Sequence, residues 1–224
     1  MELPNLLINS HINNSNALQL LLDSINLLEG AFNIYIVIGG CYDLPSYDIT
    51  QRENQTIIKA NHNSIDFTAF ISILECSDIL DIKENESFLY LHDTCKVGLE
   101  FINKLKKYTP FNTIGIGHPS MNIGIYEMKT LKQFERKIME LKNNDPLKEL
   151  FFKNQGFNVE GLILHLSRCP LIINNKAPYE VKGYEDIYNT GYKRRIDYIE
   201  CLDLYKFKAN YPNSERNDKN RLSL

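Results

Sequence analysis

The residues with the clearest capacity for chemistry are His92, Asp93 and Thr94, which directly follow the apolar run at residues 88–91. Four consecutive apolar residues are typical of a strand that is buried on both faces of a parallel sheet. Open α/β sheets bind ligands at the carboxyl ends of their strands. We therefore predict the functional site at this point of the chain.

A strand-end carboxylate is a suitable ligand for Mg²⁺ or Mn²⁺, and Asp93 is the residue expected to bind such an ion. The ion could bridge a diphosphate and stabilise it as a leaving group, acting as a Lewis acid. A structural role is the alternative, because Asp93 or Thr94 can cap a helix that follows. The two roles are compatible.

Polar residues follow the other apolar runs of the first half of the chain as well. Among them, Asp43 could accept hydrogen bonds from a ribose, and Asn61 could face a ligand. All five histidines lie at or near the ends of apolar runs: His11, His62, His92, His118 and His165. This pattern indicates either a shared ligand site or the ordinary concentration of polar residues in loops. For His165, which lies within an apolar stretch, a core position is the more common explanation.

Several nucleotide and hydrolase motifs are absent from the sequence. It contains no G-x-G-x-x-G, no G-x-x-x-x-G-K-[ST] and no G-x-S-x-G. Their absence argues against a dinucleotide dehydrogenase, a P-loop kinase and an α/β-hydrolase. The Lys-Arg-Arg run at residues 193–195, next to Tyr188 and Tyr192, could clamp phosphates, although a solvated basic strand edge explains most such runs.

Composition places the chain among ordinary globular proteins. It has 224 residues, 43% of them hydrophobic, and a net charge of −3, which provides no field for attracting nucleic acid or an anionic membrane. The five cysteines are scattered and form no C-x-x-C pair, a pattern typical of reduced thiols. The sequence contains no apolar segment of membrane-spanning length and does not begin like a secretory signal, so we predict a cytoplasmic protein.

Hydrophobic periodicity predicts the elements that position these residues. Strands are expected near residues 6–8, 34–38, 55–60 and 88–91, and helices near 18–28, 67–74 and 97–105. This alternation predicts an α/β fold with a mostly parallel sheet and helices on both faces.

The second half of the chain follows a different pattern. Strands are expected at 113–117 and 121–126, a helix at 130–141 that opens with a Thr130/Gln133 capping box, and a short helix at 147–152. Residues 161–166 fit a helix or a strand equally well. We predict one domain over residues 1–210, followed by a polar, flexible tail over residues 211–224.

The order of these features resembles the nucleotide-sugar glycosyltransferases of the GT-A fold, in particular the small domains encoded by large DNA viruses and bacterial polysaccharide clusters. The resemblance covers about the first three quarters of the chain. It depends on residues 6–10 as first strand and nucleotide loop, on 88–94 at the place of the Asp-x-Asp strand, and on 121–126 as an Asn-x-Gly strand. The chain departs from the family because His92-Asp93-Thr94 carries a single carboxylate.

The resemblance implies transfer of a sugar from a nucleoside diphosphate, with a UDP-sugar as the first expectation, to a hydroxyl of a glycan or another acceptor, without nucleic acid. The residues that it implies for the donor and acceptor sites are Asn9, His11, Asp43, Asn61, His92 and Asn122. Asp93 would hold Mn²⁺ or Mg²⁺, and His165 would complete the metal shell. The candidates for a catalytic base are Glu127, Glu160 and Asp186.

Two other classes of function remain open. A nucleotidyltransferase, or another metal-dependent phosphotransferase, would use the same strand-end carboxylate with a nucleoside triphosphate. A non-catalytic carbohydrate- or protein-binding domain would use the tyrosine-rich C-terminal surface and would not depend on a metal.

Overall fold

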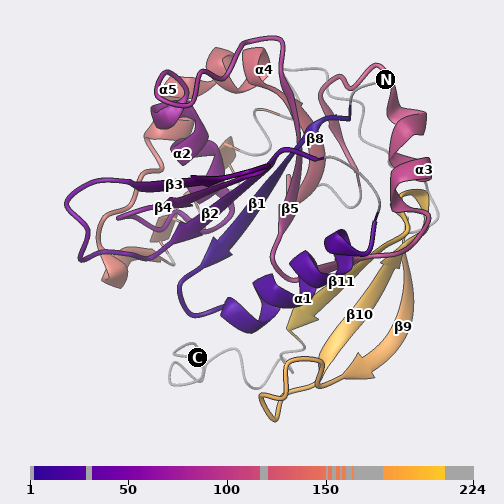
Figure 1. Ribbon diagram of the computed structural model, residues 1–224. Helices are drawn as coiled ribbons and strands as arrows, with labels where there is room; N and C mark the ends of the chain where they lie inside the picture. Colours follow the sequence, from indigo (N-terminus) through magenta and orange to yellow (C-terminus); the bar gives the residue numbers. More distant parts are fainter. Residues whose placement is uncertain are drawn as a thin grey trace.

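The computed structural model describes residues 3–28, 32–116, 121–149, 151–152, 155–156, 158–159, 163 and 179–209 (Figure 1). Its main feature is a seven-stranded sheet with the order β3-β4-β2-β1-β5-β8-β7. These strands are β1 (Asn5–His11), β2 (Ile34–Gly39), β3 (Asp48–Arg52), β4 (Gln55–Lys59), β5 (Ser87–His92), β7 (Ile114–Gly115) and β8 (Ile123–Glu127). The four predicted strands of the first half are confirmed as β1, β2, β4 and β5.

The sheet is mixed, with a parallel centre. β4, β2, β1 and β5 are mutually parallel, whereas β3, β8 and β7 each pair antiparallel with their neighbours. The chain first extends the sheet from β1 to β2 and β4, and then returns to place β5 on the other side of β1. The strand order therefore reverses between β1 and β5. The apolar run at residues 88–91 lies in β5, so its carboxyl end is next to this reversal.

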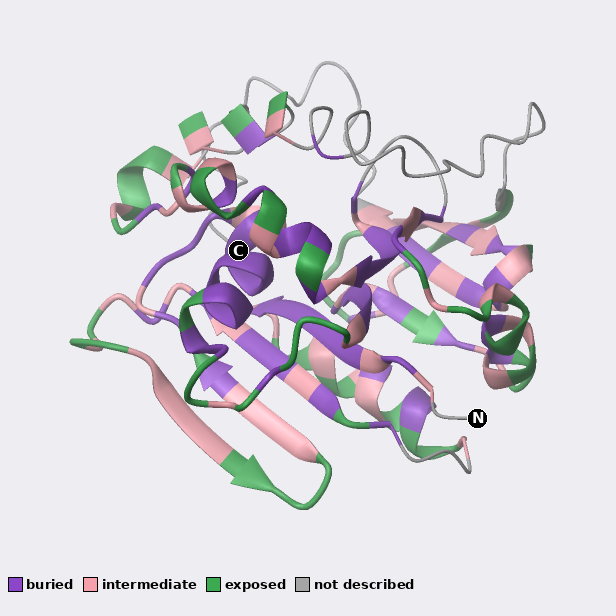
Figure 2. Cartoon of the chain, turned by 90° about the horizontal axis from the view of Figure 1, so that it is seen from above, coloured by how far each residue is buried: buried purple, intermediate pink, exposed green. Residues whose placement is uncertain are grey.

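Helices cover both faces of this sheet, as predicted. They are α1 (Ser15–Asn26), α2 (Thr68–Cys76), α3 (Phe101–Leu105), α4 (Met128–Gln133) and α5 (Glu135–Met139). Because side chains alternate along a strand, Leu7 packs with α2, α4 and α5, while Leu6 and Ile8 pack with α1 and α3 on the opposite face. In Figure 2 most residues of the strands in the middle of the sheet have the purple colour of buried residues.

A second, antiparallel sheet has the order β6-β11-β10-β9. It consists of β6 (Cys95–Val97), β9 (Tyr179–Glu185), β10 (Arg194–Ile199) and β11 (Leu204–Ala209). The helix predicted near residues 97–105 is confirmed only in its second half, as α3, because Val97 belongs to β6, which pairs with β11, and α3 begins at Phe101. β10 lies between two strands, so Arg194 and Arg195 do not form a sheet edge.

The remaining differences are local. The predicted helix 130–141 consists of α4 and α5, divided at Phe134, and α4 already begins at Met128. Thr130 therefore lies inside the helix and accepts a hydrogen bond from Thr113 at 2.9 Å instead of capping. Strand β3 was not predicted, and the predicted tail 211–224 lies outside the described residues, as does the 161–166 stretch apart from Ile163. None of the helices in the described part of the chain has the length and apolar content needed to cross a membrane.

Candidate functional site

The carboxyl ends of the parallel strands bring most of the predicted site residues to one edge. Asn9 of β1 is the register partner of His92 of β5, and His11 is the partner of Gly39 of β2. The loop after β4 joins this edge, since Gly40 donates its backbone N–H to the His62 carbonyl at 3.0 Å. β8 starts at the same edge, where Ile123 pairs with Leu91, and this places Asn122 nearby.

Asp93 is directed into the protein rather than toward solvent. The residue is 3% exposed, and its Oδ2 accepts a hydrogen bond from Ser10 Oγ at 2.9 Å. Burial raises the pKa of the Asp93 carboxyl, and this effect is opposed by the Ser10 hydrogen bond, the charge of Lys206, and hydrogen bonds from Asn14 and the Thr94 backbone. The carboxylate thus connects the end of β5 to the end of β1 and to the residue before α1.

His92 is also held by its neighbours. Its Nε2 lies 3.0 Å from the hydroxyl of Tyr90 and 3.4 Å from a carboxylate oxygen of Asp66. The same Tyr90 hydroxyl donates to the Asp66 carbonyl at 2.6 Å. These contacts orient the imidazole through a nitrogen that a metal ion would otherwise use.

The predicted metal site does not fit Mn²⁺ or Mg²⁺. Such ions bind several accessible oxygen ligands. The Asp93 carboxylate, in contrast, is buried and accepts hydrogen bonds from Ser10 and Asn14. In the described ranges, no group of three or more His, Cys, Asp or Glu side chains could hold a metal ion. The further ligand His165 lies outside the described residues. We therefore assign Asp93 a positioning role.

We expect Asp93→Asn to fold, and to gain stability relative to the wild type as the pH rises from about 3 to about 7. A carboxyl whose folded pKa is raised above 3.8 stabilises the fold when protonated and loses that contribution as the pH rises through the folded pKa. An amide cannot ionise, so the variant escapes this loss. Urea unfolding of both proteins at several pH values measures the difference between their free energies of unfolding. If the advantage of the variant stays constant or decreases as the pH rises, the prediction is contradicted.

Asn9 is a structural residue, which corrects the prediction that it contacts a nucleotide. The residue is 7% exposed, its Nδ2 donates to the carbonyl of Ile65 at 2.9 Å, and its Oδ1 accepts from the backbone N–H of Ala69 at 3.0 Å. Both groups of the side-chain amide are thus used to fix the start of α2 against β1. Little of the side chain remains for a ligand.

His11 and Gly40 form an accessible pair at the same edge. The backbone N–H of Asn13 donates to His11 Nδ1 at 3.2 Å, which leaves Nε2 as the protonated nitrogen of the neutral ring. Gly40 has φ +83°, and a Cβ at this position would lie 2.4 Å from His11 Nε2. The left-handed backbone conformation therefore favours glycine at this position, and the imidazole lies directly against it. Asp43 is exposed and Asn61 is partly exposed beside this pair.

The carboxylates considered as catalytic bases are poorly placed. Glu127 pairs with Ser87 at the start of β5, which puts it at the opposite edge of the sheet from His92. Although partial burial opposes the effect, hydrogen bonds from Lys129 and Thr113 hold the pKa of Glu127 below its ordinary value, the reverse of what a general base requires.

The other two candidates for the base are not supported either. Asp186 closes the turn between β9 and β10 by accepting backbone hydrogen bonds from Thr190 at 2.9 Å and Gly191 at 2.6 Å. The hydrogen bond from Thr190 in particular lowers the pKa of Asp186, desolvation opposes this effect, and the bond from Gly191 lowers the pKa further. Glu160 lies outside the described residues.

One residue at this edge was missed from the sequence. Lys206 is 7% exposed, and its ammonium donates to Thr94 Oγ1 at 2.8 Å. In β11, Lys206 and Lys208 alternate with Tyr205 and Phe207, which favours a prediction that the lysines face solvent. No local signal could have indicated that this lysine is buried at the end of β5.

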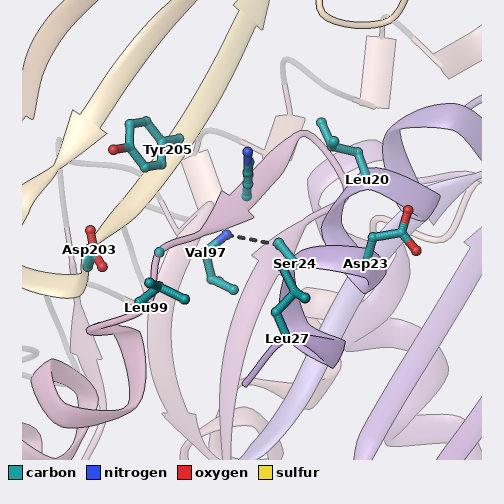
Figure 3. A pocket seen from close by; sticks show the side chains of 10 residues that line it. Leu20, Asp23, Ser24, Leu27, Val97, Leu99, Asp203 and Tyr205 are labelled. Carbon is teal, nitrogen blue, oxygen red and sulfur yellow. Dashed lines mark hydrogen bonds between the residues drawn. The ribbon is translucent and has the colours of Figure 1, made fainter. Parts of the chain in front are cut away.

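The described residues also form a groove of about 600 Å³ that lies away from the predicted site. It runs between α1, β6 and the start of β11, and its lining includes Leu20, Ser24, Leu27 and Leu99 (Figure 3). Ser24 Oγ accepts the backbone N–H of Val97 at 3.1 Å and so ties α1 to β6 at this groove. None of the residues predicted for the site line it.

No protein-family model matches the sequence, and no curated protein matches it. Function is therefore inferred from the residues of this chain and their arrangement.

Proposed function

We propose that the protein binds a nucleoside diphosphate sugar at the carboxyl edge of its parallel strands and transfers the sugar to an acceptor hydroxyl, as a GT-A-like glycosyltransferase. The observation that carries this proposal is the reversal of strand order between β1 and β5. Ligands of open α/β sheets bind outside the carboxyl ends of strands at such a switch point. The strands that flank it end in His11 and His92, and Asp93 and Thr94 follow His92 directly.

The accessible residues suggest where each part of the donor would lie. His11 and Gly40 lie together at the ends of β1 and β2, where an imidazole and a residue without a side chain could contact the nucleoside. The exposed carboxylate of Asp43 could accept hydrogen bonds from ribose hydroxyls. Asn122, at the start of β8 beyond β5, would face the acceptor side.

Ligand-dependent thermal stability tests this proposal. A UDP-, GDP- or dTDP-sugar is expected to raise the melting temperature, because a ligand that binds only the folded state at a hundredfold excess over Kd adds about 2.7 kcal/mol of stability. We expect the shift to persist in EDTA, since Asp93 and His92 do not fit a metal ion. The intact nucleoside diphosphate sugar and the nucleoside diphosphate that the transfer would release can be compared in the same assay.

A pair of exposed aspartates provides the matched control. Asp43→Ala should reduce the nucleotide-dependent shift, whereas Asp78→Ala, in the segment that leads from α2 to the start of β5, should leave it unchanged. A shift with nucleoside triphosphates alone would indicate a nucleotidyltransferase instead. The absence of a shift with any nucleotide would refute the proposal in favour of a binding domain.

A further inference from the structure

Glu149 is a carboxylate that a later part of the chain brings to the carboxyl edge of the parallel strands. It directly follows the 3₁₀ turn Pro146–Lys148, and the loops after β2 and β4 hold its side chain. Its Oε1 accepts a hydrogen bond from the Tyr42 hydroxyl at 2.7 Å and another from Asn63 Nδ2 at 2.8 Å. Burial, followed by the hydrogen bond and the charge of Glu149, raises the pKa of the Tyr42 hydroxyl, which therefore remains a donor.

The segment that leads to Glu149 is fixed to the loop after β4 by hydrogen bonds. The backbone N–H of Asn63 donates to the carbonyl of Asn143 at 2.9 Å, and Asn143 Nδ2 donates to the Asn63 carbonyl at 3.1 Å. The backbone N–H of Asn143 also donates to Ser64 Oγ at 3.1 Å. Since Asn143 is 2% exposed, the segment is positioned by a buried connection to this loop.

The Asn63 side chain is oriented so that its amide nitrogen donates to Glu149. Asn63 Oδ1 accepts hydrogen bonds from the backbone N–H of Ile65 at 3.0 Å and from Thr68 Oγ1 at 3.2 Å. An amide oxygen that already accepts from two donors fixes the direction of the amide, so Nδ2 is the group on the side of Glu149. The Glu149 carboxylate is therefore held by two donors whose own positions are determined by the fold.

The pair of His11 and Gly40 belongs to the same set of contacts. The backbone N–H of Gly40 donates to the carbonyl of His62 at 3.0 Å, and His62 directly precedes Asn63. The Gly40 Cα in turn lies against the imidazole of His11. The residues proposed above for the nucleoside and the Glu149 carboxylate thus lie on neighbouring loops of one edge.

One oxygen of this carboxylate is not used by the described residues. Both hydrogen bonds end on Oε1 of Glu149, so Oε2 accepts none within the described part of the chain. The neighbouring Lys148 pairs with Asp145 at 3.2 Å instead of with Glu149. Glu149 is partly exposed, and its Oε2 is not one of the buried polar atoms that lack a partner. The oxygen is therefore accessible to hydrogen-bond donors of a ligand.

The bases of nucleotides differ in what they present to such an oxygen. Guanine has a ring N–H next to an exocyclic amino group, whereas uracil and thymine have a ring N–H between two carbonyl groups. Adenine and cytosine have an unprotonated ring nitrogen at the corresponding position. A carboxylate only accepts hydrogen bonds, and charge-assisted bonds are the stronger ones, so two adjacent N–H donors suit it best. Carbonyl oxygens and ring lone pairs would be repelled.

We propose that Glu149 is a specificity-determining residue that accepts hydrogen bonds from the adjacent N–H groups of guanine. The sugar donor would then be a GDP-sugar instead of the UDP-sugar that the sequence resemblance implies. A base without adjacent N–H donors leaves the carboxylate unpaired, and such unpaired groups are the basis of strong discrimination. That the ligand carries a sugar rests on the proposed function, whereas recognition of the base depends on Glu149 and the two donors that hold it.

Calorimetric titration with GDP, IDP and UDP tests this inference. IDP is the sharpest probe, because its base differs from guanine only by the absence of the amino group. Wild-type protein is expected to bind GDP about tenfold or more tightly than IDP, as for the loss of a hydrogen bond to a charged group, and also more tightly than UDP. Glu149→Gln retains an oxygen for Tyr42 and Asn63 but places an amide nitrogen at the open position, so the preference for GDP over IDP should be lost.

Glu84→Gln is the matched control, because Glu84 is an exposed glutamate just before the start of β5, at the opposite edge of the sheet, and the preference should persist there. Tyr42→Phe removes one of the two hydrogen bonds to Glu149 and should weaken the preference. Should Glu149→Gln fail to fold, the comparison of GDP with IDP in the wild type and in Tyr42→Phe decides.

The outcomes separate this inference from the proposed function. Equal affinity of the wild type for GDP and IDP, tighter binding of UDP, or a preference for GDP that persists in Glu149→Gln overturns the role of Glu149. Binding of a UDP-sugar would then leave the proposed function standing. A preference for GDP that depends on Glu149, without binding of any nucleotide sugar, supports the inference and refutes the proposed function. The absence of binding by any nucleotide overturns both.

Discussion

Acidification from about pH 7 to about pH 4 is expected to destabilise the protein by roughly 3 kcal/mol through the single buried side chain of His62. The residue is fully buried, with Nε2 at 2.9 Å from the Tyr47 hydroxyl and at 3.4 Å from Ser72 Oγ. Burial lowers its pKa from 6.5 to about 4; the charge of Lys142 adds to this effect, and that of Glu75 opposes it.

The direction follows from proton uptake by the two states. Below pH 6.5 the unfolded chain protonates this histidine, whereas the folded protein keeps the imidazole neutral down to about pH 4. The stabilisation that neutral His62 provides is thus complete above pH 6.5 and is lost as the pH falls toward 4. Below about pH 4, the free energy of unfolding no longer changes through this residue. A pKa difference between 6.5 and about 4 corresponds to a free energy of roughly 3 kcal/mol.

Urea unfolding between about pH 4 and about pH 7 measures this loss in the wild type and in His62→Gln. The variant should lack this part of the pH dependence, whatever its stability at neutral pH. His11→Gln, at the partly exposed histidine that ends β1, should retain it. Equal pH dependence in the wild type and in His62→Gln would contradict the assignment.

Phe70→Ala is expected to cost about 3–5 kcal/mol, as is typical for removal of a buried phenyl ring. Phe70 is fully buried in α2, where its ring stacks on Tyr90 at a centroid distance of 4.4 Å and meets Tyr126 edge-on at 5.2 Å. Removal of the ring would leave a cavity and also lose these aromatic contacts. A loss of this size is large relative to the stability of an ordinary domain.

This substitution also affects the candidate site. Tyr90 carries the hydroxyl that contacts His92 Nε2 at 3.0 Å and the Asp66 carbonyl at 2.6 Å, so a loosened ring would disturb the end of β5. Thermal and urea unfolding measure the stability. Phe151→Ala is the control, because Phe151 is 58% exposed and its loss should change stability by about 0.5 kcal/mol or less. A cost below about 1 kcal/mol for Phe70→Ala would show that this cluster is not the centre of the core.

The sequence alone determined the strands of the parallel centre and the helix that follows the first of them. The runs at 6–8, 34–38 and 88–91 are apolar without interruption, and α1 carries Leu21 and Ile25 at helical spacing on its buried face. Such patterns are local, because burial on two faces or on one face requires a particular order of neighbouring residues. The polar residues at the ends of these strands could therefore be predicted to share one edge of the sheet.

The tertiary structure alone decided what those residues do. Asp93 is turned inward by Ser10, which lies 83 positions away, and Lys206 is buried against Thr94 across 112 positions. Glu127 follows the direction of β8, whose antiparallel pairing with β5 sends its last residue to the opposite edge of the sheet. No short pattern encodes such contacts, since the direction of a side chain at a strand end depends on which distant segment pairs with or packs against it.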